Sequence, residues 1–108
     1  MLTNQQLLLA KTAEEASEVQ KECLKGQVYG IQSMHNGERN CDLIREEVLD
    51  LLVCIRRLEK AGIIRRIKPS DVSKHFYSKR PKIVRRTVQA IKDEQIDPEC
   101  YALIPEYL

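Results

Sequence analysis

The chain has 108 residues, of which 43% are apolar and 31% are charged, and its net charge at neutral pH is +2. This length and composition are typical of one globular domain with a modest core, and the charge is too small to indicate a nucleic-acid or membrane surface by itself. No apolar run approaches the length of a membrane span, and the first residues lack the features of a signal peptide, so we expect a cytoplasmic protein without membrane contact.

Two long helices are expected in the first part of the chain. The first is predicted over residues 3–25, with a capping box between Thr3 and Gln6 at its start and Gly26 as its stop. After a loop that contains three glycines, the second helix is predicted over residues 40–61, where another glycine follows.

Two shorter helices are expected to follow. Pro81 fits the first turn of a helix, so the sequence predicts a third helix over residues 71–79 and a fourth over 81–94. Residues 96–108 contain two prolines and several apolar side chains, and we expect them to pack on the domain or on a partner chain as an extended tail. Period-two strand patterns are absent, so residues 1–108 are predicted to form a single all-α domain, an antiparallel hairpin extended by two shorter helices.

Acidic residues stand where the second helix should be apolar. On a helical wheel at 100° per residue, Glu47 falls near the centre of the apolar face, and Asp50 lies about 60° to one side. Glu15 and Glu18 repeat this spacing of three residues on the first helix, so the members of each pair share one face. Antiparallel packing of the two helices would gather the four carboxylates at their seam.

The free-energy cost of four carboxylates at one helix–helix seam has to be offset by other interactions. Burial of ionised carboxylates costs several kcal/mol each, and raised pKa values, cationic partners or a bound metal ion relieve that cost. Oxygen ligands favour a hard cation, Mg²⁺ or alternatively Mn²⁺. The main competing interpretations are a solvated acidic helix face and ion pairs with Arg45, Arg56 or Arg57.

Zinc is disfavoured, because neither histidine nor cysteine belongs to this group of acids. The four cysteines of the chain form no C-x-x-C pair. Cys23, Cys41 and Cys54 fall within helical patterns and are expected to be buried free thiols.

The motifs EEASE (residues 14–18) and EEVLDLL (residues 46–52) occur in the order E-x-x-E, spacer, E-x-x-D. This pattern resembles that of the MazG-type all-α nucleoside triphosphate pyrophosphohydrolases, and the resemblance covers about residues 8–62. It implies that four acids hold Mg²⁺ and carry catalysis, namely Glu15, Glu18, Glu47 and Asp50. The implied reaction is hydrolysis of a (d)NTP at the α-phosphorus to a (d)NMP and pyrophosphate, for nucleotide-pool control or house-cleaning.

The resemblance also implies a homodimer or homotetramer of four-helix-bundle type, and the wide apolar arc of the second helix favours such an assembly. Candidate phosphate-binding cations are Lys21, Lys25, Arg39, Lys79, Arg80 and Lys82. Tyr29 is a candidate for stacking on a base, although for all seven residues an exposed side chain without a role is the competing interpretation. The segment SKRP (residues 78–81) resembles a Lys-aromatic-Pro segment of dCTP-type family members, but Phe76 stands where those members have an asparagine.

Three other functions remain open at this point. The first is a phosphoribosyl-ATP pyrophosphohydrolase, which the same acids could serve. The second is a non-enzymatic helical interaction module with an acidic seam. The third is a nucleic-acid-binding protein that uses the basic segments at residues 65–68 and 79–86, which is disfavoured because acidic residues nearly balance the basic ones.

Overall fold

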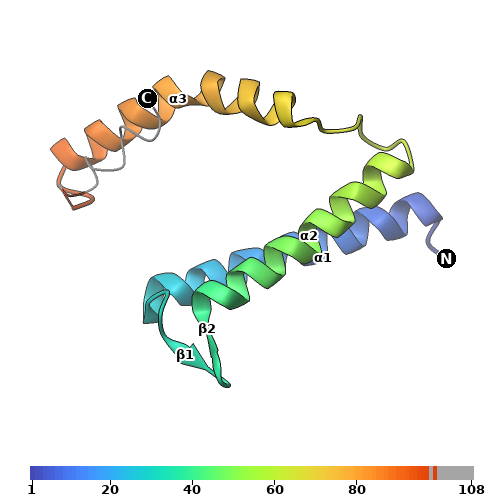
Figure 1. Ribbon diagram of the computed structural model, residues 1–108, viewed down its shortest axis with the longest axis horizontal. Coiled ribbons are helices and arrows are strands. Elements are labelled where there is room, and N and C mark those ends of the chain that lie inside the picture. The colour runs from blue at the N-terminus through green and yellow to red at the C-terminus, as the bar shows by residue number, and fades with distance from the viewer. Residues whose placement is uncertain (98, 100–108) are drawn as a thin grey trace. The chain divides into compact units, whose positions relative to one another are not determined.

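The computed structural model describes residues 1–97 and residue 99, and the chain divides into two compact units, Met1–Arg66 and Ile67–Leu108. The first unit contains α1 (Asn4–Tyr29), β1 (Met34–His35), β2 (Glu38–Arg39) and α2 (Asn40–Lys60), and the second contains α3 (Pro69–Lys92) (Figure 1). The described chain is mostly helical, as predicted. The tail predicted over residues 96–108 lies almost entirely outside the described residues.

Helix α1 begins as predicted but ends later. The Thr3 hydroxyl accepts a hydrogen bond from the Gln6 amide at 3.1 Å, and the Gln6 side chain accepts one from the Thr3 amide at 2.9 Å, which confirms the capping box. The predicted stop at Gly26 is wrong, because the helix continues to Tyr29 and is closed by Gly30 at φ 93°. A Cβ atom at Gly26 would lie 3.3 Å from Cδ1 of Ile44, so this glycine allows α1 and α2 to approach closely instead of ending the helix.

A small β-hairpin connects the two long helices, where the sequence analysis expected no strands. Its strands pair Met34 with Arg39 and His35 with Glu38. The turn between them consists of Asn36 and Gly37, both at positive φ (52° and 83°), as the tight turns of two-residue hairpins require.

The start of α2 is tied back to the end of α1 through Asn40. This residue is only 2% exposed; its side-chain amide donates to the Gly30 carbonyl at 3.0 Å, and its backbone amide donates to the Ser33 carbonyl at 3.0 Å. The predicted start of the second helix at residue 40 is therefore confirmed, and these bonds fix how α2 leaves the loop.

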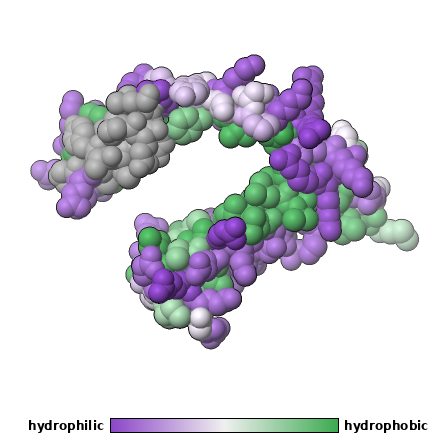
Figure 2. Space-filling view, viewed as in Figure 1, coloured by the Kyte–Doolittle hydropathy of each residue, from purple (hydrophilic) through white to green (hydrophobic). Residues whose placement is uncertain are grey.

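Helices α1 and α2 run antiparallel and pack along their length (Figure 1). Within the described part of the chain, the buried apolar residues are only Cys54 and Leu58. Leu49, Leu52 and Val53 remain 43%, 44% and 54% exposed, and Figure 2 shows apolar surface gathered over α2. The antiparallel pair of α1 and α2 thus has a small core, and much of its apolar surface remains exposed.

The helical cysteines are free thiols, but only Cys54 is buried as predicted. Cys41 is half-buried and Cys23 is exposed. Cys23 directly follows Glu22, the buried residue of that helical turn. The next residue of a helix lies about 100° further round, so the Cys23 thiol points away from the seam.

One helix, α3, replaces the third and fourth helices of the prediction, and Pro81 lies inside it. The fixed φ of proline is itself helical, so the ring removes one backbone hydrogen bond and crowds the preceding turn without dictating a break. No described residue of α3 is buried. None of the described helices is both long enough and apolar enough to cross a membrane.

Candidate metal centre

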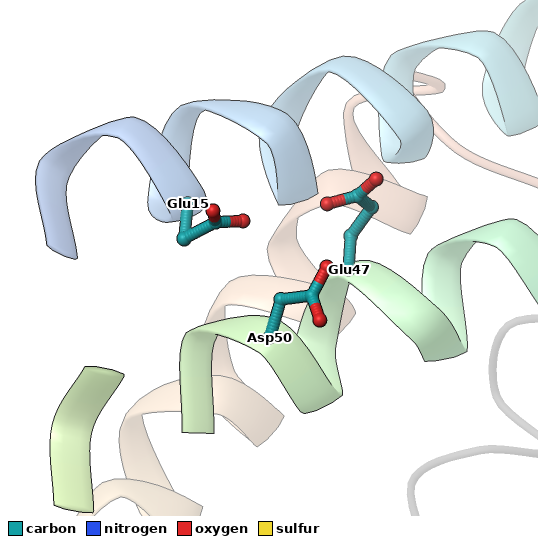
Figure 3. A group of neighbouring side chains, drawn as sticks. All are labelled: Glu15, Glu47 and Asp50. Atoms are coloured by element: carbon teal, nitrogen blue, oxygen red, sulfur yellow. The ribbon is translucent and has the colours of Figure 1, made fainter. Parts of the chain in front are cut away.

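Three of the four predicted acids converge between α1 and α2. Glu15 comes from α1, Glu47 and Asp50 come from α2, and one carboxylate oxygen of each lies within 4.8 Å of the other two. Their side chains point into the space between the helices (Figure 3). Glu15 and Glu47 are half-buried and Asp50 is exposed, so the group is open to solvent on the side of Asp50.

Glu18, the fourth predicted acid, is half-buried one turn further along α1 but does not belong to this group of three. It still lies near enough for its charge to raise the pKa of Glu47. Glu18 therefore lies near Glu47 without being a member of the group.

The electrostatics of the seam are unfavourable for ionised acids. The pKa of Glu47 is raised above its ordinary value of 4.5, first because burial removes water from the carboxylate and then because of the negative charges of Asp50, Glu18, Glu15 and Glu22. A bound cation would remove both causes, because it replaces the lost solvation and neutralises the repulsion.

The predicted alternative of internal ion pairs is not what the structure has. Among the described residues, no basic side chain forms an ion pair with any of the three grouped acids. Arg56 instead pairs with Glu59 at 2.8 Å, and Arg45 is exposed.

A fifth acid, Glu22, was missed by the sequence analysis. It is only 7% exposed, and its Oε1 accepts a hydrogen bond from Lys25 Nζ at 3.3 Å. Its Oε2 is buried and has no hydrogen-bond partner within the described part of the chain. The signal was present in the sequence, because Glu22 follows Glu18 by four residues and Glu15 by seven and so shares their helix face.

The candidate cations of the first unit are spread over two places. Lys21, Lys25 and Tyr29 are spaced by four residues and line one shallow hollow on α1. Tyr29 is 70% exposed, and Lys25 is the one of the three that reaches the acidic seam, through Glu22. Arg39 is exposed at the start of α2, eight residues before Glu47, which corresponds to about 12 Å along a helix axis.

The remaining candidate cations belong to α3. Lys79 borders an apolar hollow that also contains Val72, Phe76 and Ile83. The Arg80 guanidinium lies 5.7 Å from the centre of the Tyr77 ring, a cation–π contact. Lys82 groups with Arg85 and Arg86 on a basic surface. Since all three cations lie in the second unit, a role for them beside the carboxylates stays a prediction.

The donor set fits a hard divalent cation. Three carboxylates from two helices, with oxygens less than 5 Å apart and no ion-pair partner among the described residues, are suitable ligands for Mg²⁺ or Mn²⁺. Glu22 lies outside this group, and its buried Oε2 has no hydrogen-bond partner among the described residues. No protein-family model, curated protein or solved structure matches this chain.

Proposed function

We propose that the protein is a Mg²⁺-dependent nucleoside triphosphate pyrophosphohydrolase, which converts a (d)NTP to the (d)NMP and pyrophosphate. The observation that carries this proposal is the convergence of Glu15, Glu47 and Asp50 from two antiparallel helices, with the pKa of Glu47 raised. This arrangement agrees with the resemblance of the two acidic motifs to the MazG-type enzymes. An acidic site repels a bare triphosphate, so a cation has to lie between the two.

The residues of the chain have distinct roles in this proposal. Bound Mg²⁺ would neutralise phosphate oxygens and lower the pKa of a bound water molecule. Glu15, Glu47 and Asp50 would hold the ion. A carboxylate oxygen left free by the ion would accept the proton of the attacking water, while the bond from the α-phosphorus to its bridging oxygen breaks and pyrophosphate leaves.

Lys25 is the basic residue best placed to assist on the α1 side. Its Nζ already lies at the seam, 3.3 Å from Glu22, and its side chain is 31% exposed, so the amine remains accessible to an anionic ligand. Lys21 is exposed one turn before it on the same helix face. Both amines would offer positive charge to phosphate oxygens that the metal ion does not neutralise.

We further propose that the working form is a homodimer or homotetramer. The hairpin buries few apolar side chains, whereas Leu49, Leu52 and Val53 lie side by side at the surface of α2. A second copy packed on this face would complete a four-helix bundle and remove the apolar surface from water.

The test is an assay of pyrophosphate release from a panel of NTPs and dNTPs, with phosphoribosyl-ATP as a separate substrate, in Mg²⁺ and in EDTA. We expect release from at least one nucleotide in Mg²⁺ only, with loss of activity in Glu15→Gln and full activity in Glu46→Gln, an exposed acid beside the site. Release of pyrophosphate from phosphoribosyl-ATP alone would indicate a phosphoribosyl-ATP pyrophosphohydrolase instead. No release from any substrate, together with a melting temperature that Mg²⁺ leaves unchanged, would favour a non-enzymatic interaction module.

A further inference from the structure

Helix α3 concentrates positive charge that the rest of the chain lacks. It contains seven lysines and arginines but a single acidic residue, Asp71, so its net charge is +6. The whole chain carries only +2, which leaves −4 for the residues outside α3. The near balance of charge that disfavoured nucleic-acid binding at the level of the sequence is therefore an average over oppositely charged parts of the chain.

The basic residues of α3 share one face because α3 is a single helix. The expected break before Pro81 would have divided them between two helices, but α3 runs without interruption from Pro69 to Lys92. On a wheel with Lys82 at zero, six of the seven basic residues fall within about 80° on either side. These six residues form the basic face of α3: Lys74, Lys79, Lys82, Arg85, Arg86 and Lys92. From its first lysine to its last, this face spans about 27 Å along the helix axis.

The basic face is exposed and is not neutralised by the described residues. All six of its residues are exposed, and none of them forms an ion pair within the described part of the chain. Lys82, Arg85 and Arg86 line one shallow hollow. Asp71 is engaged at the start of the helix, where its Oδ2 accepts a hydrogen bond from the Lys68 backbone amide at 2.8 Å. Like charges on one face repel one another, so a bound polyanion would relieve this repulsion and release its own counterions.

An aromatic residue beside the basic face favours a nucleic acid whose bases are accessible. Tyr77 is 62% exposed and lies about 60° beyond the edge of the basic face that Lys74 marks. The Arg80 guanidinium lies over its ring, 5.7 Å from the centre. Cations that follow a phosphate backbone, together with an aromatic ring on which a base stacks, are the combination by which proteins bind single strands. The bases of a duplex are stacked on one another and could not use the ring in this way.

The opposite face of α3 argues against a membrane surface as the partner. An interfacial helix buries its apolar face at the boundary between headgroups and acyl chains. In the second half of α3, the apolar residues opposite the basic face are already half-buried within the chain, namely Ile83, Val84, Val88 and Ile91. Contact with lipid would require them to be uncovered, whereas contact with phosphates requires the basic face alone.

We propose that the basic face of α3 binds the phosphate backbone of single-stranded nucleic acid, and that Tyr77 stacks on one of its bases. This activity is additional to the proposed hydrolysis of nucleotides and does not use the carboxylate group between α1 and α2. The cations hold the strand without reading its sequence, so binding is tolerant of sequence and strongly dependent on salt.

Fluorescence anisotropy of labelled oligonucleotides, with the full chain in EDTA, tests the proposal. The probes are a single strand of about 15 nucleotides, as DNA and as RNA, and a DNA duplex of the same sequence. We expect the single strand, as DNA or as RNA, to bind more tightly than the duplex. Binding of the duplex at least as tightly as either single strand would overturn the assignment to single strands.

Loss of cations from the basic face should change the affinity and its salt dependence together. The triple variant Lys82→Gln, Arg85→Gln and Arg86→Gln removes three exposed charges from a helix in which no described residue is buried. For three lost phosphate contacts, the slope of log affinity against log salt should fall in magnitude by about 2, and the affinity in 0.1 M salt should fall by about 100-fold. Circular dichroism should show the helix content of the wild type.

The matched control removes the same number of exposed charges from α2, in the triple variant Arg45→Gln, Arg57→Gln and Lys60→Gln. It lowers the net charge of the chain equally but leaves α3 intact, so its affinity should stay within about threefold of the wild type, since screening limits the effect of distant charges. An equal loss in both triple variants would show a response to net charge alone and would overturn a site on α3.

A second variant separates stacking from charge. Tyr77→Ala should weaken the single strand by at least about fivefold without changing the salt slope, because it removes a ring and no charge. Single-strand affinity equal to that of the wild type in Tyr77→Ala would overturn the role of this ring.

The remaining outcomes keep this proposal distinct from the proposed function. A wild-type chain that binds no strand would overturn a nucleic-acid site on α3 and leave the hydrolysis of nucleotides to its own assay. Strand binding that requires Mg²⁺ in place of EDTA would assign the strand to the carboxylate group and would also overturn the proposal. Binding of phosphatidylserine vesicles without binding of any strand would assign the basic face to a membrane surface instead.

Discussion

Replacement of Glu47 by glutamine should change stability in opposite directions with and without metal. Glutamine has nearly the same shape as glutamate but no charge, so it removes the repulsion between residue 47 and the other acids. One carboxylate oxygen from each of Glu47, Glu15 and Asp50 lies within 4.8 Å of the other two. Two unit charges at that distance repel by about 0.9 kcal/mol in water and by about 3.5 kcal/mol at an effective dielectric constant of 20.

The value near that of water applies here, because Asp50 is exposed and Glu15 is only half-buried. At about 1 kcal/mol for each of two pairs, less some screening by salt, metal-free Glu47→Gln should be more stable than the wild type by about 1–2 kcal/mol. For a domain of this size, each kcal/mol corresponds to roughly 4–8 °C in melting temperature.

Addition of Mg²⁺ should reverse this order. An ion present at about 100 times its dissociation constant stabilises the folded wild type by about 2.7 kcal/mol. Glu47→Gln lacks a ligand at the centre of the group and should gain little. Melting curves in EDTA and in saturating Mg²⁺, at one protein concentration and neutral pH, measure both effects. Glu46→Gln should stay within about 0.5 kcal/mol of the wild type in either condition. The reasoning is refuted if Glu47→Gln is the less stable protein in EDTA, or if Mg²⁺ leaves the wild-type melting temperature unchanged.

Three further predictions concern pH, packing and assembly. Because the pKa of Glu47 is raised above 4.5 in the folded chain, protonation of Glu47 stabilises the metal-free protein. This stabilisation should be fully present below about pH 4.5 and lost as the pH rises through the raised pKa. Urea titrations across pH should show this fall in the free energy of unfolding of the wild type and a smaller fall in Glu47→Gln. Gly26→Ala should stabilise α1 by up to about 1 kcal/mol through helix propensity, provided that the terminal methyl of Ile44, 3.3 Å from the new Cβ, moves slightly; a clear loss of stability in thermal melts would show that it does not. Val53→Asp should convert the proposed oligomer to monomers in light scattering, and an unchanged mass would exclude this face as the interface.

Local signals carried most of the fold that could be predicted. The capping box at Thr3 and the start of the second helix depend on residues close in sequence, and both are confirmed. The Asn36–Gly37 pair is also a local signal, typical of a two-residue hairpin, and it was available but not used. Gly26 differs, because a glycine after a helical pattern can end the helix or admit a neighbouring helix, and only the packed partner, here Ile44, decides between the two.

The candidate site, like the fold, was predictable where local spacing determines it and not where tertiary packing does. The spacing of three residues within each acidic pair and the antiparallel hairpin are enough to bring Glu15, Glu47 and Asp50 together. They do not determine which turn of α1 faces which turn of α2, so the sequence alone does not separate Glu18, at the edge of the group, from Glu22, which is more deeply buried. That depth depends on the close approach of the two helices at Gly26, which is a tertiary contact.

The two features that carry the proposals lie on opposite faces of α2, and this makes them separable. On a wheel with Glu47 at zero, Cys54 and Leu58 lie within about 20° of it and face α1, whereas Leu49 and Val53 lie more than about 110° away. The face around Glu47 carries carboxylates where a helix–helix contact is usually apolar. The face around Leu49 and Val53 exposes apolar side chains that nothing in the first unit covers. Val53→Asp should therefore abolish assembly but keep the stabilisation by Mg²⁺, while Glu47→Gln should keep assembly but lose that stabilisation. If Val53→Asp also lost its response to Mg²⁺, the carboxylate group would depend on the second copy, and the centre could not be a property of one hairpin.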